Sequence, residues 1–114
     1  MVKTLNVPFY PDNISVRADG MFVVAGIDEL ENWKACVLAK RSFCEIAFTV
    51  MTLDPVTLAL GPLYHAPPGI PSGTSAAVQV RNKLYIGSFM GDRLLEIDFS
   101  VQQESFIKQS IQPR

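Results

Sequence analysis

The sequence has little cysteine, no long apolar run and no excess of charge of either sign. Its 10 basic and 11 acidic side chains give a net charge of −1 over 114 residues, and neither sign is clustered. Because binding to phosphates needs a concentrated basic face, this pattern argues against a nucleic-acid partner. No apolar run approaches the roughly 20 residues that cross a bilayer, so we expect no membrane span.

The two cysteines, Cys36 and Cys44, are too few for a disulfide framework. They also lack the spacing of metal ligands, so we expect buried free thiols. The first residues, Met1–Pro8, lack the basic and then apolar pattern of a signal peptide. These features together predict a cytoplasmic chain, or one that has already been processed.

Apolar side chains are plentiful, at 48% of the residues, and they suffice for a hydrophobic core. The mean hydropathy of +0.20 is high for a small domain that stands alone in water. We therefore expect part of the apolar surface to be covered by something else.

Short apolar segments separated by turn residues predict an all-β chain with mainly antiparallel strands. The expected strands are Lys3–Val7, Ile14–Arg17, Met21–Ile27, Ser42–Leu53, Val56–Tyr64, Ala76–Val80, Lys83–Phe89 and Arg93–Phe99. The Asp19-Gly20 pair is typical of a type I′ hairpin turn. His65–Gly73 contains three prolines and two glycines and is predicted to be a loop.

One segment, Asp28–Arg41, interrupts the strand pattern. Leu30, Trp33 and Val37 recur at helical spacing, so we predict a short helix with Asp28 as its cap, and Trp33 as a packing anchor. The alternative is a long loop inserted between two strands.

The sequence contains an internal repeat. With a shift of 62 positions, residues 12–17 lie over residues 74–79, and residues 22–26 lie over 84–88, without a gap. A repeated four-stranded unit is typical of a β-propeller. The first blade would span residues 14–64 and the second residues 76–99, with no clear fourth strand. The strand at residues 3–7 would belong to a preceding blade or close the second one, and residues 100–114 would form a polar tail. The alternative is a two-sheet β-sandwich with a fortuitous repeat.

Three blocks of sequence resemble strictosidine synthase-like proteins and their relatives, the gluconolactonases (senescence marker proteins) and the paraoxonase-type arylesterases. The blocks are Pro8–Ile14 with Asp19–Val24, Thr52–Pro55, and Gly73–Val78 with Lys83–Phe89 and Leu94–Asp98. The resemblance implies blades of a six-bladed propeller. Active members of the metal-binding branches hold a divalent cation, usually calcium, in a central tunnel and hydrolyse lactones or esters. The remaining metal ligands of those relatives come from earlier blades, which have no counterpart here.

The resemblance implies that Asp12 and Asn13 are metal ligands, since Ca²⁺ prefers carboxylate and amide oxygens. The metal would polarise a carbonyl or activate a bound water. From the residues alone, the favoured role of Asp12 and Asn13 is the capping of a turn. Thr74 and Ser75 occupy the corresponding positions of the repeat and would line the same tunnel or bond within a turn. His65 is the single histidine and the obvious general base, unless it is a plain surface residue.

Two blades cannot close a propeller, because each needs neighbours on both faces. We therefore predict a homo-oligomer, with a dimer favoured over a trimer because twofold assemblies are commonest. The expected function is non-catalytic binding of a small ligand or a partner. The alternative is a divalent-metal-dependent lactonase or arylesterase whose site is completed by oligomerisation, and a third reading is a truncated chain that complements a larger partner.

Overall fold

The structure, a computed structural model, describes residues 1–40, 44–67, 74–88 and 94–100. Parts of several predicted strands and loops lie outside these ranges, as does the predicted polar tail apart from Ser100. Structural statements below concern the described residues.

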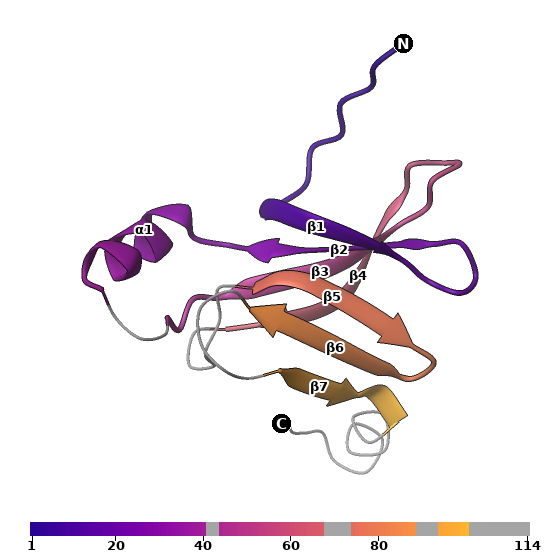
Figure 1. Ribbon diagram of the computed structural model, residues 1–114. Coiled ribbons are helices and arrows are strands. Elements are labelled where there is room, and N and C mark those ends of the chain that lie inside the picture. Colours follow the sequence, from indigo (N-terminus) through magenta and orange to yellow (C-terminus); the bar gives the residue numbers. More distant parts are fainter. Residues whose placement is uncertain (41–43, 68–73, 89–93, 101–114) are drawn as a thin grey trace.

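The described chain forms two antiparallel sheets and one helix between them in sequence (Figure 1). The elements are β1 (Tyr10–Val16), β2 (Phe22–Ile27), α1 (Leu30–Leu38), β3 (Phe48–Leu53), β4 (Leu60–Ala66), β5 (Thr74–Val80), β6 (Lys83–Ser88) and β7 (Leu95–Asp98). The first sheet, here called sheet A, has the order β1-β2-β3-β4, and the second, sheet B, has the order β5-β6-β7. The all-β prediction with one short helix is confirmed.

The hydrophobic core lies between one face of sheet A and one face of sheet B. It is formed by Val23, Ala25, Phe48, Val50 and Ala66 of sheet A with Ala77, Leu84, Ile86 and Ile97 of sheet B. These residues follow the two-residue period of strands, so each sheet turns one face inward and one outward. Strand β2 is the exception, because Val23 to Ile27 are all buried, as the unbroken apolar run predicted.

Each sheet begins with a hairpin, β1–β2 in sheet A and β5–β6 in sheet B, but the two turns differ. At the β1–β2 turn, the amide of Gly20 donates to the carbonyl of Arg17 at 2.9 Å, and Gly20 has φ of +92°. Asp19 does not take a positive φ, so the predicted type I′ turn is wrong. The turn is instead the longer kind that ends in a left-handed glycine. At the β5–β6 turn, Arg81 takes the positive φ, at 57°.

The two sheets share a bulge in their first strand. In β1 the pairing shifts between Pro11 and Ile14, and in β5 it shifts between Thr74 and Ala76. Each bulge adds one residue to the first strand, which bends it locally. A shared irregularity of this kind supports the internal repeat independently of residue identity.

The pairing corrects the alignment of the repeat by one position. Gly26 pairs with Pro11, and Ser88, 62 positions after Gly26, pairs with Thr74. Pro11 and Thr74 are therefore structural counterparts, although they lie 63 positions apart. The second strands keep the predicted shift, and the shorter β5–β6 turn absorbs the difference.

Several predicted strand boundaries are wrong. Strand β1 begins at Tyr10 rather than at Ile14, because Tyr10 and Pro11 pair with Ile27 and Gly26 before the bulge. Residues 1–7 have no regular secondary structure, so the strand Lys3–Val7 is absent. The third strand begins at Phe48, because residues 44–47 have no regular structure. The fourth begins at Leu60, because the Asp54 carboxylate accepts hydrogen bonds from the amides of Val56 and Thr57 and holds them in a turn.

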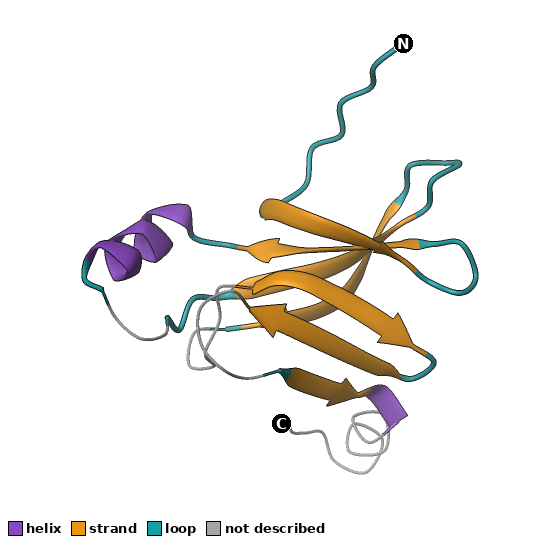
Figure 2. Ribbon diagram, viewed as in Figure 1, coloured by secondary structure: helices purple, strands orange, loops and turns teal. Residues whose placement is uncertain are grey.

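Helix α1 follows β2 and lies beside the two sheets (Figure 2). It has no buried residue, and a small cluster of side chains and a disulfide hold it in place. Its partly buried side chains pack against a cluster of buried residues, namely Leu30, Trp33 and Cys36 against Ile27, Cys44 and Ile46. Cys36 and Cys44 form a disulfide, so the prediction of free thiols is wrong. The end of the helix and the stretch before β3 bring the two Cα atoms to 6.1 Å.

The disulfide also removes one argument for a cytoplasmic chain, since disulfides persist mainly in oxidising compartments. In the part of the chain that the structure describes, no helix has the length and apolar character needed to cross a membrane.

Candidate functional site

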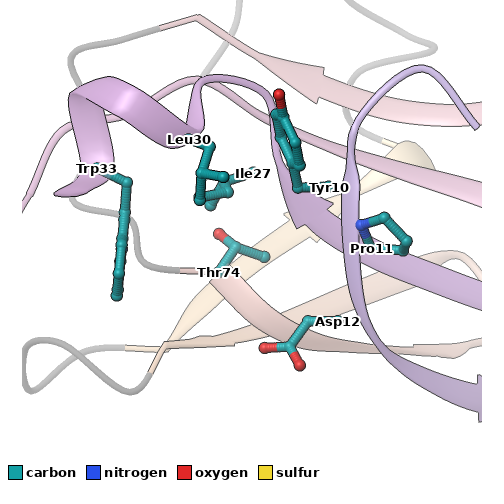
Figure 3. Close-up of a pocket in the computed structure, with 7 residues that line it drawn as sticks. All are labelled: Tyr10, Pro11, Asp12, Ile27, Leu30, Trp33 and Thr74. Carbon is teal, nitrogen blue, oxygen red and sulfur yellow. The ribbon is translucent and has the colours of Figure 1, made fainter.

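A pocket of about 170 Å³ lies where α1 meets the first strands of the two sheets (Figure 3). Its lining comes from four elements and their flanks, and consists of Tyr10, Pro11, Asp12, Ile27, Leu30, Trp33 and Thr74. The helix insertion after β2 therefore supplies one wall, and the starts of β1 and β5 supply another.

The start of β1 is held close to β2 by Gly26. A Cβ at this position would lie 2.0 Å from the carbonyl oxygen of Tyr10 and 2.8 Å from a ring carbon of Phe9. Only a residue without a side chain permits that approach. The buried Phe9 and the bulge that follows Pro11 then set the direction in which the side chain of Asp12 points.

The walls of the pocket are mainly apolar, with two polar groups on one side. Figure 3 shows Trp33 on one side and the Asp12 carboxylate on the other, with Thr74 between Asp12 and the Ile27–Leu30 wall. Thr74 is only 3% exposed, whereas Asp12 is exposed. The site thus offers an apolar recess with one accessible negative charge at its rim.

The structure brings together two of the four residues that the repeat predicted as a group. Asp12 and Thr74 line the same pocket, whereas Asn13 and Ser75 do not contribute to its lining. Asn13 is exposed within the bulge of β1, and Ser75 is half-buried. By strand pairing, Ser75 rather than Thr74 is the counterpart of Asp12.

The described residues that line the pocket do not by themselves fit a calcium ion. Asp12 is the sole carboxylate among the lining residues, and Ca²⁺ takes six to eight oxygen ligands. Among the described residues there is also no group of three or more histidine, cysteine, aspartate or glutamate side chains placed to hold a metal. A metal role for Asp12 and Asn13 therefore depends on ligands from another chain or segment.

His65 lies in strand β4, opposite Thr49, so its prediction as a loop residue is wrong. Its Nε2 lies 2.8 Å from Oδ2 of Asp28, whose Oδ1 accepts a hydrogen bond of 2.6 Å from the Thr49 hydroxyl. Asp28 is thus not the helix cap, since the cap position falls on Glu29, which makes no side-chain capping bond.

This group of Asp28, Thr49 and His65 ties the ends of three neighbouring strands together. Neither His65 nor Asp28 lines the pocket, and the His65 side chain is 58% exposed. No local pattern in the sequence indicates this pair, because the two residues are 37 positions apart and meet only through the pairing of β2, β3 and β4. Its geometry is that of a surface tie between strand ends.

Trp33 has a double role that the helical spacing indicated in part. It packs against the cluster beside the disulfide, as predicted for an anchor, and it also forms a wall of the pocket. The disulfide leaves the adjacent Cys36 fixed to Cys44, so the position of this wall depends on a covalent link.

No family model matches the chain, and comparison with curated proteins and with solved structures finds no significant match. The resemblance to the strictosidine synthase-like proteins therefore remains a hypothesis that rests on the residue blocks alone.

Proposed function

We propose that this chain is a non-catalytic binding domain that holds the apolar part of a small, positively charged ligand in the pocket beneath α1. The observation that carries the proposal is the mixed lining, in which Ile27, Leu30 and Trp33 form apolar walls and Asp12 places a carboxylate at the rim. Such sites bind by enclosing apolar surface and orient the ligand with few polar groups.

The volume sets the size of the enclosed group. A cavity of about 150 Å³ accommodates one benzene-sized ring in other proteins, and the pocket measures about 170 Å³. One six-membered ring therefore fits, and an ammonium attached to it would reach the carboxylate of Asp12. Because the pocket is small, we expect an affinity in the millimolar range for a fragment of this size.

The lining residues argue for binding rather than catalysis. They include no histidine or cysteine, and Thr74, the one hydroxyl besides Tyr10, is almost fully buried. The Asp28–His65 pair would be the natural base, but it does not border the pocket. A nucleophile and a base within hydrogen-bond reach of each other are therefore not combined at this site.

Trp33 provides the test, because it is the single tryptophan of the chain and forms a wall of the pocket. We expect cyclohexylammonium to change the emission of Trp33 in a saturable way. Cyclohexanol should bind several-fold more weakly, and cyclohexanecarboxylate should bind weakest because Asp12 repels it. Equal responses to all three compounds, or none to any, would overturn the proposal.

Asp12→Asn is the diagnostic variant, and Asp54→Asn is its matched control because Asp54 lies in the distant β3–β4 turn. We expect Asp12→Asn to lose the preference for the ammonium compound while keeping the weak binding of cyclohexanol. Asp54→Asn should keep both. Calcium-dependent hydrolysis of a lactone or aryl ester that disappears in Asp12→Ala would instead favour the hydrolase alternative.

A further inference from the structure

The outward faces of both sheets expose apolar side chains along their first strands. On sheet A, Ile14 is 57% and Val16 67% exposed. On sheet B, Val78 is 46%, Val80 53% and Tyr85 37% exposed. Isolated apolar residues on a surface need no explanation, but two aligned rows on opposite sides of one domain do.

The interface inside the chain shows how these strands pack. Strand β1 lies against β5, with the Ser15 hydroxyl donating to the carbonyl of Ala77 at 2.6 Å. One step along, Nη1 of Arg17 donates to Oε1 of Gln79 at 2.8 Å. The inward face of sheet A thus meets the inward face of sheet B through Ser15 and Arg17 on one side and Ala77 and Gln79 on the other.

The strand pairing identifies the counterparts of these residues in the other sheet. Ser15 pairs with Val23, and Val78 pairs with Tyr85, which lies 62 positions after Val23. Val78 is therefore the counterpart of Ser15. By the same register, Val80 corresponds to Arg17.

The same register applies to the opposite side of the interface. Ile14 pairs with Val24, and Ala77 pairs with Ile86, again 62 positions later. Ile14 is therefore the counterpart of Ala77, and Val16 is the counterpart of Gln79. Ile14, Val16, Val78 and Val80 are thus the counterparts of the four residues that form the inner contact. All four are branched, apolar and exposed on the outward faces of the two sheets.

We propose that the outward face of sheet B binds the outward face of sheet A of a second copy of this chain, head to tail. Val78 would then contact the second copy's Ile14, and Val80 its Val16. This interface repeats the stacking of sheet A on sheet B that the chain already contains, with apolar contacts where the inner interface has hydrogen bonds. The proposal is independent of the pocket and its ligand.

The size of the face sets the expected strength. Three strands about 4.8 Å apart and about six residues long cover roughly 300 Å². This footprint is below the roughly 800 Å² per partner of a standard interface, so we expect a dissociation constant in the micromolar range. A head-to-tail contact uses two different surfaces, so it builds either a closed ring or an open chain of copies.

The test uses sedimentation velocity of the wild-type chain from about 10 µM to about 500 µM, the range that an interface of this size requires. The mean mass should rise with concentration. Val78→Asp and Ile14→Asp should each remain monomeric, whereas Val56→Asp, at an 86% exposed position of the β3–β4 turn, should behave like the wild type. A wild-type monomer at every concentration would overturn the proposal.

Mixing the two variants distinguishes this contact from a twofold dimer. Val78→Asp keeps the outward face of sheet A intact, and Ile14→Asp keeps that of sheet B. The mixture should form a single one-to-one complex that neither variant forms alone. Failure to form it would overturn the proposal. If either aspartate variant is unfolded by circular dichroism, Val78→Thr and Ile14→Thr keep the branched shape and should each weaken association at least tenfold, and unchanged association would contradict the contact.

Discussion

Sheet A and sheet B share one arrangement of strands, and sheet A carries additional elements. Each begins with a bulged strand, turns tightly and returns as a second strand that contributes apolar residues to the shared core. Sheet A then carries α1, the disulfide and a fourth strand, and none of these has a counterpart in the described part of sheet B. The repeated strands therefore supply most of the core, whereas the insertion after β2 adds one wall of the pocket.

Gly26 in sheet A and Gly87 in sheet B should respond very differently to substitution by alanine, and the change in stability at Gly26 should exceed all the others predicted below. Gly26 of β2 leaves no room for a methyl group, because a Cβ would lie 2.0 Å from the backbone oxygen of Tyr10. Gly26→Ala should therefore lower the free energy of unfolding by about 3 kcal/mol or more, measured by urea denaturation.

The matched control is Gly87→Ala in β6. Of the residues that the structure describes, a Cβ there would meet only the side chain of Leu94, at 3.7 Å, which is an ordinary contact. We expect a change within about 0.5 kcal/mol. Equal destabilisation by the two substitutions would show that β1 does not depend on its close approach to β2.

The disulfide lies between β2 and β3 in the sequence, and sheet B has no equivalent among the described residues. The Cys36–Cys44 bond joins two residues that are 8 positions apart in the sequence. Its reduction should lower the free energy of unfolding by about 2 kcal/mol. Because α1 has no buried residue, its packing depends on this link. Hydrogen exchange should therefore accelerate in α1 far more than in β6.

Cys36→Ala combined with Cys44→Ala provides the control for reduction. This variant should be as unstable as the reduced wild type and insensitive to added reductant. A uniform loss of protection across both sheets would contradict the idea that the disulfide acts on α1 and the pocket wall.

The regular part of the fold could be predicted because it follows from local rules. Short apolar segments between turn residues located β2, β5, β6 and β7, and the spacing of Leu30 and Trp33 located α1. The predicted limits of strands are wrong where they depend on contacts between residues that are not neighbours in the sequence. The turn after β3 depends on the Asp54 carboxylate, and the end of β4 reaches His65 only because Thr49 lies opposite.

The pocket could be predicted only in part, because its walls come from segments that meet through the fold. The repeat placed Asp12 and Thr74 at matching positions, and both line the pocket, but the strand pairing shows that the two positions are not equivalent. Spacing alone could not show that Cys36 and Cys44 bond or that Trp33 faces Asp12 across a recess. Those facts depend on how the inserted helix folds back.

At the β1–β2 turn, Arg17 links the two sheets, and we expect only a small, pH-dependent change in stability when this link is altered. The Arg17 guanidinium binds both carboxylate oxygens of Asp19, at 2.9 and 2.7 Å, and also reaches Gln79 of sheet B. The hydrogen bond from Arg17 lowers the pKa of Asp19 to about 2, with help from the amide of Met21. The equivalent turn of sheet B has Arg81 at the position of Asp19 under the shift of 62.

The depressed pKa fixes the direction of the pH dependence. An unfolded aspartate titrates near pH 4, so the contribution of Asp19 is fully present above that pH and is lost as pH falls through about 2. Asp19→Asn keeps an oxygen for the Met21 amide but lacks the charge, so the stability difference from the wild type should shrink between about pH 4 and pH 2. Asn82→Ala in the other turn should show no such dependence. Because Asp19 is exposed the difference is small, and a gap that stays constant over this range would mean that the charge of Asp19 does not stabilise the link between the sheets.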